Sequence, residues 1–136
     1  MPGTVVVADM EAGLEHLSWA GGTLRYVDLL LIVLLPTEKA LLTADRAHRL
    51  AIDLGIPEVG FVGSRAGEAD RPRFEAFAAE RGCELLGFIP DDEEVRQADR
   101  TASCVIDSAP GSTSVQAIEQ LADALEARMA RSASVP

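Results

Sequence analysis

The chain has 136 residues, 48% of them hydrophobic and 25% charged, which is the composition of a single folded domain. Its formal net charge of −10 argues against a surface that binds nucleic acid or an anionic membrane. The longest apolar run, Leu29–Leu35, is far shorter than the ~20 residues of a membrane helix, and no signal peptide is recognisable. We therefore expect a cytoplasmic protein with no membrane partner and no nucleic-acid partner.

The first predicted element is a strand at residues 4–8, Thr-Val-Val-Val-Ala. A β-branched run without polar alternation is typical of a strand buried on both faces of a parallel sheet. Residues 12–20 follow as a short helix or a loop, and Gly21-Gly22 interrupts it. A second buried strand is predicted at Val27–Leu35, where Pro36 ends it.

The next predicted helix spans 38–54, with Thr37 as N-cap and Gly55 as its stop. A short apolar strand follows at 59–62, and residues 63–67 are expected to form a loop. The helix after that begins near Pro72 and ends at Gly82.

A further strand is predicted at 85–89, followed by an exit loop and a short acidic helix at 92–99. Residues 100–111 are expected to be irregular. Thr113 and Gln116 have the spacing of a capping box, which would open the final helix. Residues 131–136 are expected to be a frayed tail.

Strands and helices alternate along the chain, which predicts an α/β domain with right-handed crossovers. We expect one domain over residues 1–130, in three layers, with a mostly parallel sheet of about four strands flanked by helices. The carboxyl ends of parallel strands lie at one edge, where ligands bind in such folds.

Asp9 and Gly13 lie just after the first predicted strand. An acid there can hold Mg²⁺ through water, and a glycine can bring its N–H close to a phosphate. The same two residues would also fit an N-cap acid and a turn glycine. Ser64-Arg65 and Pro90-Asp91 leave two further strands at the same edge, where they would either frame a flat base or serve as plain connections.

The sequence gives little indication of a phosphate-binding loop or of acid/base catalysts. The sequence contains neither Gly-x-Gly-x-x-Gly nor Gly-x-x-x-x-Gly-Lys-Ser/Thr, so it has no evident cradle for β- and γ-phosphates. His16 lies in the same stretch as Asp9, but it is read as a surface residue rather than an acid/base catalyst. The acids at 91–94 are read as a solvated helix start.

The segment Asp9-Met10-Glu11-Ala12-Gly13-Leu14-Glu15-His16-Leu17 resembles the second switch of the MinD/ParA and nitrogenase-iron-protein class of P-loop ATPases. Within that class it resembles the ATPases that mature carbon monoxide dehydrogenase by inserting nickel. The resemblance extends over about residues 4–126, the second half of such an ATPase. Other segments fit the same register: Val27–Thr37, Leu54-Gly55-Ile56, Leu86–Asp99 and Ala109-Pro110.

The resemblance implies ATP and Mg²⁺ as cofactors. Asp9 would be the acid of the magnesium shell, and Gly13 would sense the γ-phosphate. Ser64 and Arg65 would stand where the family has Asn-Lys near adenine, and Pro90 and Asp91 would flank the base through backbone contacts. A serine hydroxyl cannot match the paired donor and acceptor of an amide, so base recognition would be weaker.

The family's phosphate loop, first switch and paired-cysteine motif have no counterpart in this sequence, and Cys83 and Cys104 do not replace the cysteine pair. The nickel site is therefore not present. The resemblance implies a partial ATPase, unable to hydrolyse ATP alone. Its partners would be a second copy, a chain carrying the phosphate-loop half, and a client metalloenzyme.

In that class a phosphate-loop strand lies beside the Asp9 strand, so its absence would leave unpaired backbone groups at ~1–3 kcal/mol each. Three outcomes are open: the 4–8 strand pairs directly with 29–35, another chain supplies a strand, or the isolated chain is unstable. We expect direct pairing, which would shift Asp9 by ~4.8 Å relative to the other loops.

Two other functions remain as alternatives. One is a non-catalytic module for partner binding or dimerisation, derived from the ATPase. The other is a receiver-like domain with Asp9 in an acidic pocket. The second is disfavoured because no acid follows the 59–62 strand, where a phosphoacceptor would stand.

Overall fold

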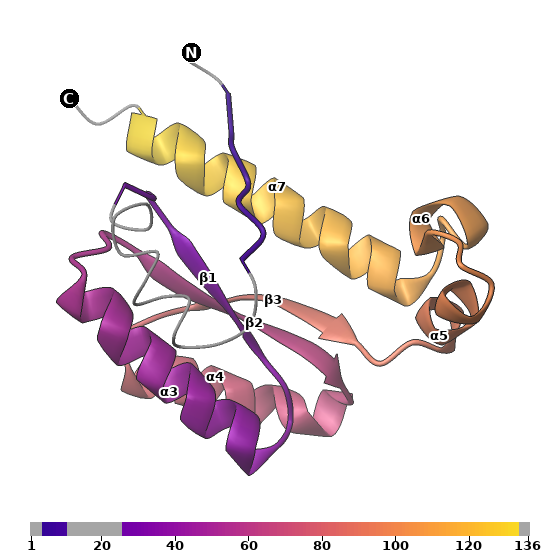
Figure 1. Cartoon of the computed structure of the whole chain (residues 1–136), viewed down its shortest axis with the longest axis horizontal. Helices are drawn as coiled ribbons and strands as arrows, with labels where there is room; N and C mark the ends of the chain where they lie inside the picture. The colour runs from indigo at the N-terminus through magenta and orange to yellow at the C-terminus, as the bar shows by residue number, and fades with distance from the viewer. Residues whose placement is uncertain (1–3, 11–25, 134–136) are drawn as a thin grey trace.

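The computed structural model describes residues 4–10 and 26–133. Three parallel strands form one sheet in the order β1-β2-β3 (Figure 1): β1 spans Leu30–Leu34, β2 spans Val59–Ala66 and β3 spans Leu85–Pro90. Helices cover both faces of this sheet. The predicted α/β class and parallel sheet are confirmed, with three strands in the described residues where about four were expected.

Local signals set the ends of α3, which spans Glu38–Asp53. The Thr37 hydroxyl accepts a hydrogen bond from the Ala40 N–H at 3.2 Å, so Thr37 is the predicted N-cap. Gly55 has a φ of +73°, a conformation that glycine adopts without strain, and it stops the helix as expected.

β2 is longer than predicted, because it continues through residues expected to form a loop. A short 3₁₀ turn, η1 (Glu68–Asp70), leads into α4 (Arg71–Glu80), with Pro72 in the first turn as predicted. Gly82, at φ +66°, follows the helix.

Three helices follow β3: α5 (Glu93–Arg100), α6 (Val105–Ser108) and α7 (Thr113–Ala133). The predicted irregular region at 100–111 therefore contains a helical turn. The predicted cap at Thr113 is wrong: Ser112 is the residue whose hydroxyl accepts from the Val115 N–H, at 3.4 Å. The predicted tail also begins too early, since α7 continues to Ala133.

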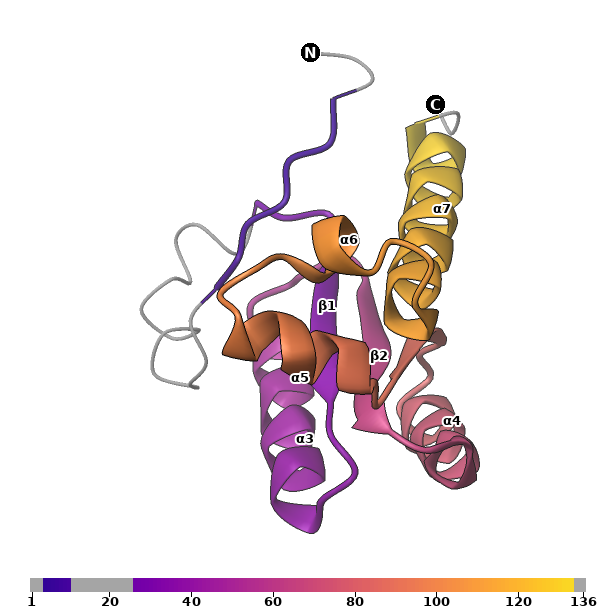
Figure 2. The same cartoon turned by 90° about the vertical axis from the view of Figure 1, so that its right-hand side faces the viewer.

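The two faces of the sheet are covered differently (Figure 2). α3 and α4 pack together on one face and enclose the main core, whose largest fully buried side chains include Leu34, Phe61 and Phe74. α7 alone packs on the other face, across β3. Its apolar stripe is half-buried at Leu121 and Leu125, and Ile118 is 46% exposed.

The predicted strand at residues 4–8 is not present. Residues 4–10 have no regular secondary structure and are exposed. Within the described residues β1 is bonded only to β2, so the expected direct pairing with residues 4–8 is wrong. A strand that is apolar on both faces is stable only when other elements pack against each face. In the part of the chain that the structure describes, only α3 provides such a layer on β1, and Val33 on the other face is 59% exposed.

Candidate functional site

Two pairs of predicted site residues meet at the carboxyl edge of the sheet. Ser64 is in register with Ile89, and Ala66 is in register with Pro90. The Asp91 N–H donates a hydrogen bond to the Ala66 carbonyl at 3.1 Å, which fixes the exit of β3 against the end of β2. The structure therefore brings the Ser64-Arg65 and Pro90-Asp91 segments side by side.

Arg65 has an unusual backbone. Its φ is +51°, and the register of β2 and β3 shifts between Ser64 and Ala66, which marks a β-bulge. A non-glycine residue in this region is uncommon and costs of order 1 kcal/mol, and such residues gather at functional sites. Within the described residues the exposed Arg65 side chain makes no hydrogen bond or ion pair. Its guanidinium is therefore available to a ligand.

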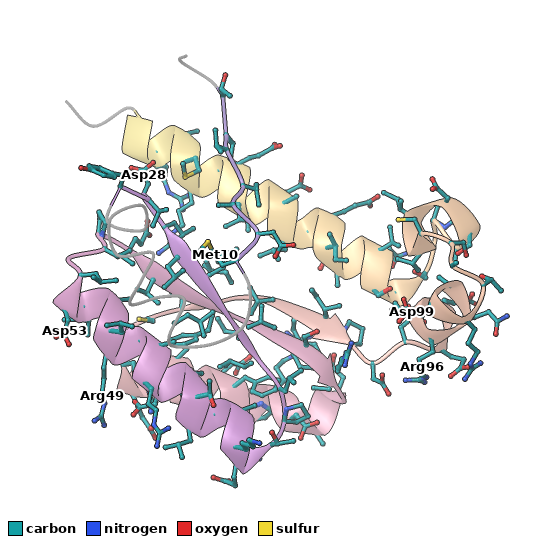
Figure 3. The ribbon with its side chains drawn as sticks, in the orientation of Figure 1. Met10, Asp28, Arg49, Asp53, Arg96 and Asp99 are labelled. Atoms are coloured by element: carbon teal, nitrogen blue, oxygen red, sulfur yellow. The ribbon has the colours of Figure 1, made fainter. Side chains whose placement is uncertain are left out.

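Asp91 is already engaged through its carboxylate. Arg96 donates to Asp91 Oδ1 at 2.6 Å and to Glu93 Oε2 at 2.7 Å. Figure 3 shows Arg96 at the end of the sheet where β3 exits, with Arg49 and Asp53 on α3 toward the opposite end. Since the Asp91 N–H also donates to Ala66, the backbone carbonyl is the polar group that Asp91 can most readily offer to a ligand.

Asp92 organises this edge, although the sequence indicated only a solvated acid. Its Oδ1 accepts from the Glu94 N–H at 2.9 Å, and its Oδ2 accepts from the Ser114 N–H at 3.0 Å. One carboxylate thus caps α5 and α7 together. These hydrogen bonds, with the Ser114 N–H contributing most, hold the pKa of Asp92 below its usual value. The only local signal for this role was an acid directly before a helix.

Of the two remaining predicted site residues, only Asp9 is among the described residues, and it is not joined to this edge. Asp9 is exposed, lies in no strand and makes no hydrogen bond or ion pair within the described residues. Gly13 lies outside the described residues. Their roles toward magnesium and γ-phosphate stay predictions.

The described residues fit only one part of a nucleotide site. A base could rest against Pro90, which is half-buried, with Ser64 and Arg65 beside it. In contrast, no group of three His, Cys, Asp or Glu side chains in this part of the chain could hold a metal ion. The sequence also has no glycine-rich phosphate loop. The residues described at this edge therefore suit the base side, and the residues predicted for the triphosphate side are Asp9 and Gly13.

A second polar cluster lies away from this edge, under α3. Cys83 Sγ is 3.6 Å from Nε2 of His48, a buried histidine. Burial is the main cause of both shifts: it lowers the pKa of His48 and raises the pKa of Cys83. Both groups are thus neutral near pH 7, and a neutral thiol is a poor nucleophile.

The chain resembles part of several characterised or partly characterised proteins. It is 46% identical over 92 residues to an uncharacterised ATP-binding protein of Methanocaldococcus jannaschii, covering 67% of this chain and 35% of that protein. It is 36% identical over 105 residues to the carbon monoxide dehydrogenase accessory protein CooC of Rhodospirillum rubrum, covering 77% and 39%. No family model matches the sequence. The chain thus spans between a third and two-fifths of the length of these relatives.

Solved structures show the same relationship. The cell division ATPase MinD of Pyrococcus furiosus superposes with a TM-score of 0.68 at 26% identity, over 87% of this chain and 49% of that one. The MinD cell division protein of Aquifex aeolicus, at 20% identity and a TM-score of 0.62, shares the fold. No helix in the described ranges is long and apolar enough to cross a bilayer. By sequence and fold together, the chain is related to the MinD/ParA-like P-loop ATPases over a part of their length.

Proposed function

We propose that the chain contributes the base-side loops and the magnesium and switch element of an ATP site that other residues must complete. The observation that carries this proposal is the juxtaposition of Ser64-Arg65 and Pro90-Asp91 at one edge of the sheet. The ligand class and the metalloenzyme client are taken from two relatives, an ATP-binding protein and a carbon monoxide dehydrogenase accessory protein.

Each residue has a distinct role in this proposal. Pro90 provides an apolar contact for the base, and the Asp91 backbone provides polar groups beside it. Arg65 brings a free guanidinium, which hydrogen-bonds more strongly to a charged ligand than a neutral donor does. Asp9 holds magnesium through water, and Gly13 senses the γ-phosphate.

The same proposal limits the activity of the chain. Phosphoryl transfer depends on positioned groups that stabilise charge on the β- and γ-phosphates. Without a phosphate loop, the chain binds nucleotide weakly and does not hydrolyse it alone. A cytoplasmic role in nickel insertion belongs to the completed assembly, since the nickel ligands of the family are not in this sequence.

Calorimetric titration of the full chain with Mg-ATP tests the proposal, first alone and then with a protein carrying a phosphate-loop half. We expect binding in the mixture, and loss of at least about tenfold in affinity for Arg65→Ala, since a charged hydrogen bond contributes about 1.5–3 kcal/mol. Arg49→Ala is the matched control, because Arg49 is also exposed but lies on α3 away from the edge. The proposal would be overturned if neither titration produced heat of binding.

A second candidate function is a non-catalytic module for partner binding or dimerisation. Exposed apolar side chains favour it: Val6 and Val7 are 86% and 87% exposed, and such side chains side by side mark interaction surfaces. This function predicts an association that neither Mg-ATP nor Asp9→Ala changes. Sedimentation measured with and without nucleotide separates it from the ATP-site proposal.

A further inference from the structure

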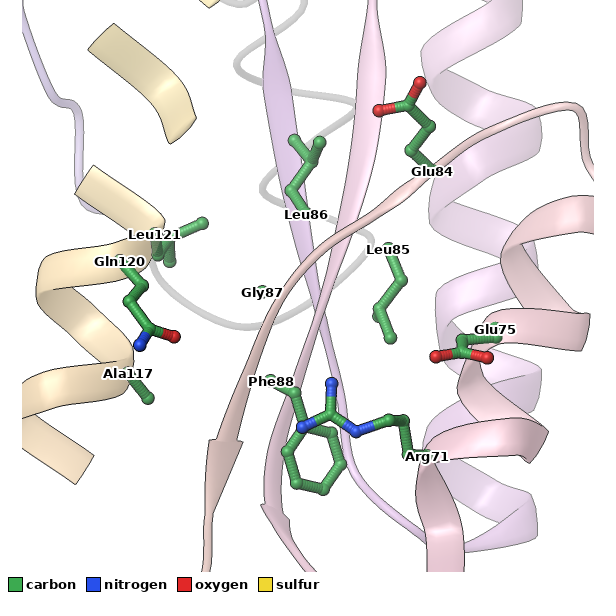
Figure 4. Close-up of a pocket in the computed structure, with 10 residues that line it drawn as sticks. All are labelled: Arg71, Glu75, Glu84, Leu85, Leu86, Gly87, Phe88, Ala117, Gln120 and Leu121. Carbon is green, nitrogen blue, oxygen red and sulfur yellow. The ribbon is translucent and has the colours of Figure 1, made fainter. Parts of the chain in front are cut away.

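A groove of about 510 Å³ runs along the free edge of β3 (Figure 4). Among the described residues β3 is the last strand in the sheet order, so one row of its backbone groups has no described strand beside it. Its central residues, Leu85 to Phe88, carry no charge that would deter pairing with another strand.

Both faces of this groove are walled by helices. Leu121 of α7 lines one side, and a Cβ added to Gly87 would lie 3.1 Å from it. Arg71 of α4 lines the other side, with its guanidinium 4.3 Å above the Phe88 ring. A strand placed here would extend the sheet, with the apolar Leu121 on one face and the aliphatic stem of Arg71, beside Glu75, on the other. The free edge of β1 lacks this second wall, because Val33 is 59% exposed.

The chain also contains a segment that fits such a groove. Residues 4–8 are Thr-Val-Val-Val-Ala, a β-branched run that is apolar on both faces and uncharged. In the structure these residues are exposed and pair with no strand. Figure 2 shows them on the β1 side of the sheet, opposite α7.

We propose that residues 4–8 of one copy add as a strand to the free edge of β3 in a second copy, between α4 and α7. Reciprocal exchange gives a closed two-fold dimer, in which the valines of each copy contact Leu121 on one face and the Arg71 side chain on the other. This dimer supplies the interface that the second candidate function needs, and it does not depend on nucleotide binding.

Charge sets how the dimer responds to salt. Each copy carries a net charge of −10, so two copies repel one another. The exchanged segment itself is uncharged, and salt screens the repulsion without weakening its contacts. Dimerisation therefore strengthens as ionic strength rises.

Disulfide trapping tests the arrangement in the full chain, with Cys104 changed to Ser and the half-buried Cys83 retained. Val6→Cys protein is mixed with Gln120→Cys protein, whose new thiol lies on the groove, and with Val33→Cys protein as the β1-edge control. We expect a disulfide between positions 6 and 120 of different chains, at least about tenfold more abundant than the 6–33 product. A dominant 6–33 product, or a 6–120 disulfide within a single chain of the double variant, would overturn the proposal.

Sedimentation velocity gives an independent readout. Val6→Lys should weaken the dimer at least tenfold, because it would replace an apolar side chain in the groove with a long charged one that must lose its hydration. Leu42→Lys is the matched control, since Leu42 on α3 is an apolar side chain that is 54% exposed outside the groove. A monomer at all concentrations, or equal effects of the two variants, would contradict strand exchange. Neither experiment measures Mg-ATP binding, so the failure of one proposal can be told from the failure of the other.

Discussion

The α3/α4 face of the sheet and the α7 face are held by different forces. On the α3/α4 face, Phe61 and Phe77 meet edge to face at 5.4 Å between ring centroids, and Arg81 stacks on Phe77 at 3.5 Å while pairing with Asp45. This face is a packed core, in which aromatic contacts add to apolar burial.

On the α7 face, polar contacts near the ends of the helix replace dense packing. Asp92 caps the start of α7, and Arg128 near its other end pairs with Glu58 and with Glu84, the latter at 2.9 Å. Between these contacts the apolar stripe is half-buried. The comparison teaches that, within residues 4–10 and 26–133, one face has a closed core while the other leaves apolar surface for a further layer.

The largest expected effect comes from making the same substitution on both faces. Leu34→Ala removes a fully buried side chain from the α3/α4 face and should lower the free energy of unfolding by roughly 2–5 kcal/mol. Leu121→Ala, on the half-buried stripe of α7, should cost about 1 kcal/mol. Urea unfolding of both variants measures the difference. Equal losses would mean that α7 packs as tightly as α3 and α4.

Adding a methyl group to a glycine on each face gives the next largest effect. A Cβ at Gly63 would lie 2.5 Å from the Phe74 ring, whereas a Cβ at Gly87 would lie 3.1 Å from the Leu121 side chain. Gly63→Ala should therefore cost about 1–3 kcal/mol through overpacking, because Phe74 is fully buried and cannot move aside.

Gly87→Ala should cost less than about 1 kcal/mol, because the half-buried Leu121 can change rotamer. Thermal unfolding of the two variants, with unchanged circular dichroism as the check on fold, gives the comparison. A larger loss for Gly87→Ala would show that the α7 face is the more rigid of the two.

The sequence predicted the structure best where a residue pattern sets the structure of residues close to it in the chain. The N-cap at Thr37, the stop at Gly55 and the proline in the first turn of α4 were all predicted, because each acts within a turn of its own residue. The strands β1 and β3 were predicted from their apolar runs. The carboxyl-edge placement of Ser64-Arg65 and Pro90-Asp91 followed from strand order alone.

Predictions from the sequence were wrong or missing where the structure of a residue depends on a distant part of the chain. The run at residues 4–8 has the composition of a buried strand, but burial requires a layer on each face, which the pattern of the run itself cannot reveal. The bulge at Arg65 arises from how β2 pairs with β3. Asp92 caps α7 from 22 residues away, and no local pattern encodes that contact.

The smallest expected effect comes from removing the hydrogen bonds that hold the start of α7. Asp92→Ala removes the acceptor for both the Glu94 and Ser114 N–H groups and should destabilise the chain by about 1 kcal/mol at pH 7. Because these hydrogen bonds lower the pKa of folded Asp92, their contribution is complete above about pH 4 and is lost as pH falls through that lowered value.

The difference in the free energy of unfolding between wild type and Asp92→Ala, measured in urea, should therefore close below about pH 4. Asp92→Asn keeps an oxygen acceptor without charge, so its loss of unfolding free energy should be smaller and independent of pH. Hydrogen exchange locates the effect: amides in the first turn of α7 should lose protection in Asp92→Ala, while those of α3 keep theirs. A gap that persists unchanged at pH 3, or equal loss of protection in α3, would mean that Asp92 does not anchor α7 through its ionised carboxylate. In that case the packing between Leu121 and β3 would have to hold the helix, and the contrast between the two faces would disappear.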